Sequence, residues 1–205
     1  MVAALLAIVF HEVAHGFVAF LMGDKTARND GRLSLNPLKH IDPIGALCLL
    51  VFHFGWAKPV PVNPYFFKNR KWGMIAVSLA GPLSNFLLAL ISILIFCISN
   101  DVYVIDRMIY TANGLSFVDD FWCVFTQINL GLFLFNLLPV PPLDGSKVIA
   151  QFLPAKAKWN YLSFERYGGI ILFVAIYFLN LSDLLGVALN FIYYHLFEWI
   201  SGIFV

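Results

Sequence analysis

Residues 1–22 read MVAALLAIVFHEVAHGFVAFLM, an apolar stretch that carries two histidines and a glutamate near its middle. About 20 apolar residues suffice to cross the roughly 30 Å hydrocarbon core of a bilayer. Comparable stretches recur at residues 72–99, 121–138, 167–181 and 184–204. Gly23 and Asp24 follow the first stretch, and glycine commonly ends a helix. The pattern predicts an all-α polytopic membrane protein with about five transmembrane helices.

The composition supports a membrane protein. Of the 205 residues 60% are hydrophobic and 12% are charged, and the mean hydropathy is +0.82. A soluble domain of this size carries about 25% charged residues. The net charge is +1 and no basic run occurs, so the chain shows no feature of a nucleic-acid-binding protein. We therefore expect the chain to be embedded in a lipid bilayer.

The segment between the first two stretches is mixed in character. Residues 44–55 are apolar but too short to cross a membrane, which favours a re-entrant or interfacial piece. Residues 32–35 and 58–62 alternate as extended segments do, although prolines confine the second to an edge or loop. We therefore expect a small re-entrant or β element there. Either alternating segment could pair with another extended polypeptide segment, and residues 32–35 offer more backbone donors.

Lys and Arg residues indicate the orientation. Eight of the 13 lie between the first two stretches, four lie between the third and fourth, and only Arg107 lies between the second and third. Cytoplasmic loops carry the excess of positive residues. The distribution predicts a multi-pass protein of the plasma membrane with its N-terminus outside and its C-terminus in the cytoplasm.

The polar residues of the first stretch form an HExxH sequence. His11 and His15, four residues apart on a helix, can reach one metal ion, and Glu12 beside them can take a proton from water. Zinc is the metal that such sites bind, with one position left open for water. The alternative is a buried polar cluster without metal. A charge at this depth costs about 2.5–3.5 kcal/mol, and a metal would offset that cost.

Two histidines leave zinc one protein ligand short, and Asp144 is the candidate for the third. His15 lies about 10 Å from the cytoplasmic end of the first stretch at 1.5 Å per residue. Asp144 follows the cytoplasmic end of the third, where Pro139, Pro141 and Pro142 break the helix and can fold the chain back. By local sequence alone, Asp144 could equally cap the next helix. The matching depth favours a ligand.

Five motifs together resemble the site-2 protease family of intramembrane zinc metalloproteases, in its short prokaryotic form without PDZ or CBS domains. They are FHEVAHG at 10–16, GRLSLNPLKHIDP at 31–43, GWAKPVPVNP at 55–64, AGPLSN at 80–85 and FNLLPVPPLDG at 135–145. The resemblance implies zinc at His11, His15 and Asp144, with Glu12 as the catalytic base. It implies one domain over residues 1–205, with a catalytic core at about 1–150 and additional helices at about 165–205.

Two asparagines within these motifs have two open interpretations. The amide of Asn85 or Asn136 could bind the substrate carbonyl or its oxyanion, or it could make an interhelical hydrogen bond. For Asn129 the structural role is favoured. His40 is interpreted as a structural residue, and His53 lies outside the motifs. His195 and Glu198 are interpreted as residues at the membrane interface.

The predicted reaction is hydrolysis of peptide bonds in or near transmembrane segments. The substrates would be transmembrane proteins or remnant signal peptides, in the manner of regulated intramembrane proteolysis. The alternative is a metal-binding membrane protein without catalysis, or a relative that only binds client helices. A metal carrier would offer ligands in several spans along a path, whereas here they concentrate at one depth. The intact Glu12 argues against a catalytically inactive relative. The cysteines Cys48, Cys97 and Cys123 lack a CxxC spacing, although a disulfide between the last two is conceivable.

Overall fold

The core of the protein consists of three long apolar helices, α1 (Val2–Leu21), α4 (Arg70–Ser99) and α5 (Phe117–Asn136). The computed structural model describes residues 2–42, 45, 58–100, 102–105, 108–111, 117–178 and 180–203. Within these ranges, α1, α4 and α5 are the helices long and apolar enough to cross a membrane. α4 packs against both α1 and α5. Their bounds lie within four residues of the predicted stretches, so the predicted fold class, a membrane protein built on helices, is confirmed.

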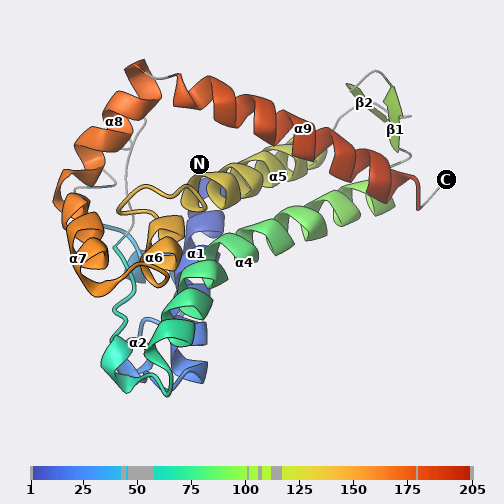
Figure 1. The fold of residues 1–205 in the computed structure, drawn as a ribbon. Helices are drawn as coiled ribbons and strands as arrows, with labels where there is room; N and C mark the ends of the chain where they lie inside the picture. Colours follow the sequence, from blue (N-terminus) through green and yellow to red (C-terminus); the bar gives the residue numbers. More distant parts are fainter. Residues whose placement is uncertain are drawn as a thin grey trace.

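Local signals explain where these helices begin, bend and end. Asn69 caps α4 by accepting a hydrogen bond from the Trp72 amide at 3.2 Å. Figure 1 shows α4 bending partway along, and Pro82 lies inside the helix. α1 is followed by Gly23, whose φ of +113° suits only glycine. A Cβ on Gly23 would also lie 2.8 Å from the Phe66 carbonyl oxygen.

In its described residues, the segment between α1 and α4 is held together by hydrogen bonds rather than by a sheet. It contains α2 (Thr26–Asn29) and two 3₁₀ turns, η1 (Pro37–Lys39) and η2 (Pro64–Phe66). Residues 58–63 are non-helical, as predicted, but no strand is assigned in the described residues of this segment. The Arg32 guanidinium donates to the carbonyls of Lys58 and Pro59 at 2.6 and 3.3 Å. The predicted re-entrant piece at 44–55 lies outside the described residues, except for residue 45.

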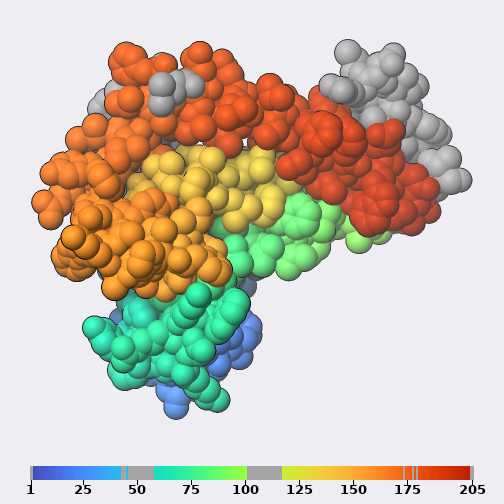
Figure 2. Space-filling view, in the orientation of Figure 1, coloured from blue at the N-terminus to red at the C-terminus, as the bar shows by residue number. Residues whose placement is uncertain are grey.

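Four helices and a 3₁₀ turn follow α5: α6 (Asp144–Ala150), α7 (Ala155–Ser163), η3 (Phe164–Tyr167), α8 (Gly168–Phe178) and α9 (Leu181–Ser201). At 1.5 Å per residue the 11 residues of α8 span about 16 Å, which is too short to cross a bilayer core. α9 reaches back across the bundle and packs on α5 and α4. Figure 2 shows this orange-to-red arm wrapped around the core helices. The predicted count of five membrane spans is therefore not confirmed.

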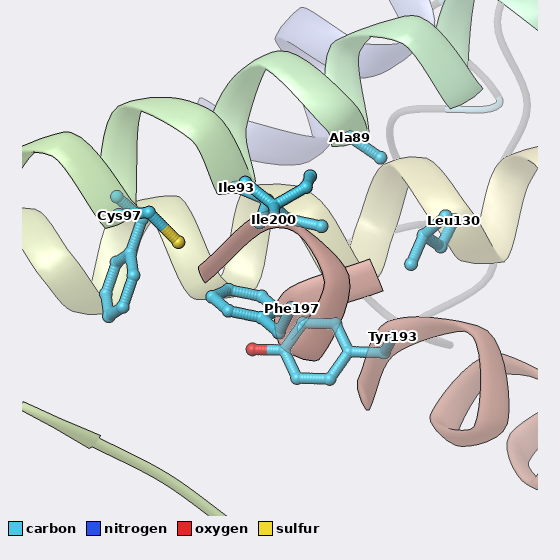
Figure 3. Close-up of a cluster of buried hydrophobic side chains, with 8 residues drawn as sticks. Ala89, Ile93, Cys97, Leu130, Tyr193, Phe197 and Ile200 are labelled. Atoms are coloured by element: carbon cyan, nitrogen blue, oxygen red, sulfur yellow. The ribbon is translucent and has the colours of Figure 1, made fainter. Parts of the chain in front are cut away.

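α9 contributes to the largest buried cluster. Its Tyr193 and Phe197 form a cluster with residues of α4 and with Leu130 of α5 (Figure 3). The rings of Phe96 and Phe197 pack edge to face with centroids 5.5 Å apart. Cys97 belongs to the same cluster. Cys97 and Cys123 are both free thiols, so the disulfide considered between them is absent; Cys48 lies outside the described residues.

The described strands lie between α4 and α5. β1 (Val102–Ile105) and β2 (Met108–Thr111) pair antiparallel, with Val102 opposite Thr111 and Ile105 opposite Met108. This hairpin is not among the elements predicted from the sequence. Its β-branched and aromatic residues were the available signal for strands.

Candidate metal centre

The two histidines of α1 point their Nε2 atoms at one another. His15 Nδ1 donates to the Val77 carbonyl at 2.7 Å, and His11 Nδ1 lies 2.5 Å from Asn85 Oδ1. A neutral imidazole has one N–H. Because each ring uses that N–H at Nδ1, each Nε2 presents a lone pair, and the two Nε2 atoms are 3.0 Å apart.

Asp144 brings a third electron-pair donor to the same point. It is the first residue of α6, it is 5% exposed, and its Oδ2 lies 3.2 Å from His11 Nε2 and 3.1 Å from His15 Nε2. Because Oδ2 approaches both lone pairs, Asp144 acts as more than a helix cap. Its position agrees with the depth argument from the sequence.

The three atoms fit a zinc ion. Bonds of about 2.0–2.1 Å in tetrahedral coordination place neighbouring ligand atoms about 3.3 Å apart, and the observed edges are 3.0–3.2 Å. Three lone pairs this close repel each other unless a cation lies between them. Within the described residues, this trio is the group of His, Cys, Asp or Glu side chains that could hold a metal ion.

The surroundings favour the ionised form of Asp144. Burial alone would raise the pKa of its carboxyl, whereas the positive charge of Lys147 lowers it. The Lys147 Nζ donates to one carboxylate oxygen, Oδ1, at 3.2 Å. The carboxylate therefore keeps Oδ2 for a metal while Oδ1 is hydrogen-bonded.

Asn85 lies behind His11 rather than in the cavity. Its Nδ2 donates to the Ala7 carbonyl at 3.2 Å and to Asn129 Oδ1 at 2.8 Å, which uses both hydrogens of the amide. Asn129 in turn donates to the Phe125 carbonyl at 2.8 Å. Asn85 thus has no free donor for an oxyanion. Its Oδ1 accepts from His11 and fixes the ring in the tautomer that presents Nε2.

Glu12 lies beside the trio without joining it. The half-buried carboxylate accepts a hydrogen bond from the Val60 amide at 2.9 Å. Pro59 and Pro61 have no N–H, so Val60 provides the single backbone donor of this three-residue stretch. The extended segment therefore fixes one oxygen of Glu12 and leaves the other for chemistry.

A cavity of about 470 Å³ opens onto these residues, a volume typical of ligand sites. It is lined by His11, Glu12, His15, Ser78, Asn136, Asp144 and Lys147 and by residues of the 58–64 segment, among others. Asn136 donates one amide hydrogen to the Leu132 carbonyl at 3.0 Å. Its second hydrogen has no partner in the described part of the chain, so Asn136 can donate to a bound substrate.

Gly81 was not identified from the sequence as a residue that the site requires. A Cβ at this position would lie 2.5 Å from the Nε2 atoms of both histidines, so only glycine lets α4 approach the site. The signal in the sequence is the spacing of Ser78, Gly81 and Asn85, which puts small residues on one face of the helix and favours close helix packing.

The remaining histidines lie apart from the site. His40 is 1% exposed, donates from Nε2 to the Ser34 carbonyl at 2.8 Å, and accepts from the Lys58 amide through its carbonyl, which is a structural role. His195 and Glu198 are exposed on α9, and His195 bonds the Phe191 carbonyl. His53 lies outside the described residues.

Comparison with known proteins agrees with the motifs. Residues 108–181 match the profile of peptidase family M50. YwhC of Bacillus subtilis, named as a candidate zinc metalloprotease, is 41% identical over 174 residues, which are 85% of this chain and 78% of YwhC. The chain belongs to peptidase family M50. The resemblance to the site-2 proteases is thereby confirmed, and the M50 chain is a membrane protein with several apolar helices.

More distant relatives carry similar names. Rip2 of Mycolicibacterium smegmatis is 27% identical over 83% of the M50 chain, and a Methanocaldococcus jannaschii protein is 31% identical over 74% of it; both are named as candidate zinc metalloproteases. The M50 chain spans 63% and 65% of their respective lengths. No solved structure shows a significant match.

Proposed function

We propose that this chain is an intramembrane zinc endopeptidase that hydrolyses peptide bonds in or near transmembrane segments. The observation that carries the proposal is the convergence of His11, His15 and Asp144 beside Glu12, with both histidines on a helix long enough to cross a membrane. Membership of family M50 and the names of its relatives support proteolysis and zinc.

His11, His15 and Asp144 would hold the metal through Nε2, Nε2 and Oδ2. Zinc bound there supplies Lewis acidity toward the substrate carbonyl and acidifies a water molecule. Asn85 and the Val77 carbonyl keep the two rings oriented, and Lys147 keeps the carboxylate oriented. These contacts pre-organise the site before substrate arrives.

Glu12 would act as the general base and then as the general acid. Its carboxylate takes a proton from the attacking water and returns it to the nitrogen of the leaving amine. The Val60 amide holds one carboxylate oxygen during both steps. Asn136, across the cavity, would donate its free amide hydrogen to the substrate backbone.

The substrates would be single-span membrane proteins or remnant signal peptides. A helix must unwind before its backbone reaches the site, and unwound groups in lipid need hydrogen-bond partners. Pro59, Val60 and Val62 line the cavity, whereas no lining residue comes from 32–35. This supports the 58–62 segment as the edge that pairs with substrate, in place of the segment favoured from sequence. The Lys and Arg distribution supports cytoplasmic access in the plasma membrane.

The test is a Glu12→Gln variant, purified in detergent and given a synthetic single-span fusion protein as substrate. We expect cleavage by the wild type and at least about a 10²-fold loss in Glu12→Gln, the lower range of general acid–base catalysis. Glu12→Gln should keep its zinc, measured by metal analysis, because Glu12 is not a ligand. The control is Glu165→Gln, an exposed glutamate that should leave both readouts unchanged.

The alternative function predicts a different result. If the protein only binds metal or client helices, the wild type and both variants should hold zinc, and none of them should cleave the fusion protein. Wild-type cleavage rates in Glu12→Gln would exclude Glu12 as the base.

A further inference from the structure

Ser78 on α4 is a buried hydroxyl without a hydrogen-bond partner at the edge of the catalytic cavity. It is 2% exposed, its Oγ has no partner in the described part of the chain, and it lines the cavity with Glu12 and His15. An unpaired buried hydroxyl costs stability. The Ser78 hydroxyl is therefore available to a group that enters the cavity.

Two other serines of α4, Ser84 and Ser92, show what a helical hydroxyl ordinarily does. Ser84 Oγ donates to the Gly81 carbonyl at 2.7 Å, and Ser92 Oγ donates to the Ala89 carbonyl at 3.0 Å. Both use the carbonyl three residues earlier, as serine in helices commonly does. Ser78 lacks such a bond. Helical propensity and packing therefore do not account for its hydroxyl.

The backbone around Ser78 is polar as well. Pro82, four residues later, has no N–H, so the Ser78 carbonyl lacks its ordinary helical donor. The preceding carbonyl, of Val77, accepts from His15 Nδ1, and Gly81 abuts both Nε2 atoms. This turn of α4 is thus the wall that faces the two histidines.

The other side-chain donors of the cavity are already engaged at least once. Both histidine Nδ1 atoms are bonded, Lys147 donates to Asp144, and Asn136 uses one of its two amide hydrogens. Ser78 alone among the described lining donors is wholly uncommitted. No histidine or carboxylate hydrogen-bonds to its Oγ, so it lacks the base that a nucleophilic serine needs.

We propose that Ser78 is a catalytic residue whose hydroxyl donates a hydrogen bond to the oxygen of the scissile carbonyl as negative charge develops there. This role rests on the proposed endopeptidase function. No bond to Ser78 forms or breaks; the hydroxyl keeps its proton and stabilises the oxyanion. Because the hydrogen bond strengthens toward the transition state, its loss lowers kcat more than it raises KM.

The test compares Ser78→Ala with Ser92→Ala, a matched buried serine of α4 whose hydroxyl is bonded. Cleavage of the single-span fusion protein, zinc content and thermal unfolding are measured for each purified variant. Ser78→Ala should lower kcat by about 10- to 100-fold, toward the loss of one oxyanion donor, with zinc content and Tm not reduced. Ser92→Ala should lower Tm and leave kcat unchanged.

Three outcomes would overturn the role of Ser78. Wild-type kcat in Ser78→Ala would exclude a catalytic hydrogen bond. A loss of kcat that matches a loss of zinc or Tm, or an equal loss in Ser92→Ala, would show a structural role. Absence of zinc-dependent cleavage by the wild type would overturn the endopeptidase function itself, and the role of Ser78 with it.

Discussion

At the scale of single residues, the site depends on a chain of side-chain contacts that ends at the metal-facing nitrogens. The Phe125 carbonyl orients Asn129, Asn129 orients Asn85, and Asn85 holds His11. Each amide in this chain has one orientation that satisfies its neighbours. A ring fixed in this way meets the metal without losing rotational freedom, which strengthens binding.

Replacement of Asp144 tests the third ligand. Asp144→Ala should lose most bound zinc and activity together, because two histidines alone leave the metal under-coordinated. Metal analysis and the cleavage assay on the same sample measure this. Asp30→Ala, at an exposed carboxylate, should leave both unchanged. Full zinc occupancy in Asp144→Ala would remove it from the ligand set.

At the scale of helices, the metal centre requires α1 and α4 to approach closely. Gly81 provides the room, since its missing side chain is replaced by the edges of His11 and His15. The Val60 amide, held in place through Arg32, then closes the same site from the 58–62 segment. Contacts from α4 and from the 58–62 segment thus fix the two histidines and Glu12, the proposed base, on α1.

The substitution Gly81→Ala, which adds one methyl group, tests how closely α1 and α4 must pack. Gly81→Ala would place a Cβ 2.5 Å from both Nε2 atoms, so α1 and α4 must separate and zinc content should fall. Gly186→Ala is the control, because a Cβ there meets nothing within 4 Å. In a helix interior it should stabilise by up to about 1 kcal/mol. Equal zinc contents in the two variants would contradict the close packing.

At the scale of the whole molecule, α9 acts as a cover over the outer parts of α4 and α5. Its buried face carries Tyr193 and Phe197, whose ring centroids are 4.8 Å apart, while Phe191 and Trp199 are exposed. The cluster in Figure 3 lies apart from the cavity, since none of its members lines it. α9 should therefore contribute to stability rather than to metal binding.

Truncation of Phe197 separates these contributions. Phe197→Ala removes a fully buried ring and should destabilise by about 3–5 kcal/mol, measured by thermal or denaturant unfolding in detergent. The ratio of zinc to folded protein should stay at the wild-type value. Phe191→Ala, at an exposed ring, should change stability little. Loss of zinc from folded Phe197→Ala would link α9 to the metal centre.

The sequence by itself indicated the helical core and the three candidate ligands of the metal centre. The length of the apolar stretches predicted α1, α4 and α5, because a helix needs about 20 apolar residues to cross the hydrocarbon core of a bilayer. His11 and His15 were predictable as a pair, because the helical repeat places residues i and i+4 on one face. The motifs added Asp144, which lies 133 residues from His11 and lies beyond any local periodicity.

Only the tertiary structure showed which contacts the residues around the metal centre make. The orientation of Asn85, the free hydroxyl of Ser78, the closeness allowed by Gly81 and the donor of Val60 all depend on contacts between distant segments. Sequence pattern shows which face of a helix a residue occupies, but not which polar atoms meet it there. The packing of distant segments determines these hydrogen-bond partners, because a buried donor or acceptor can bond only to the polar atoms that packing brings beside it.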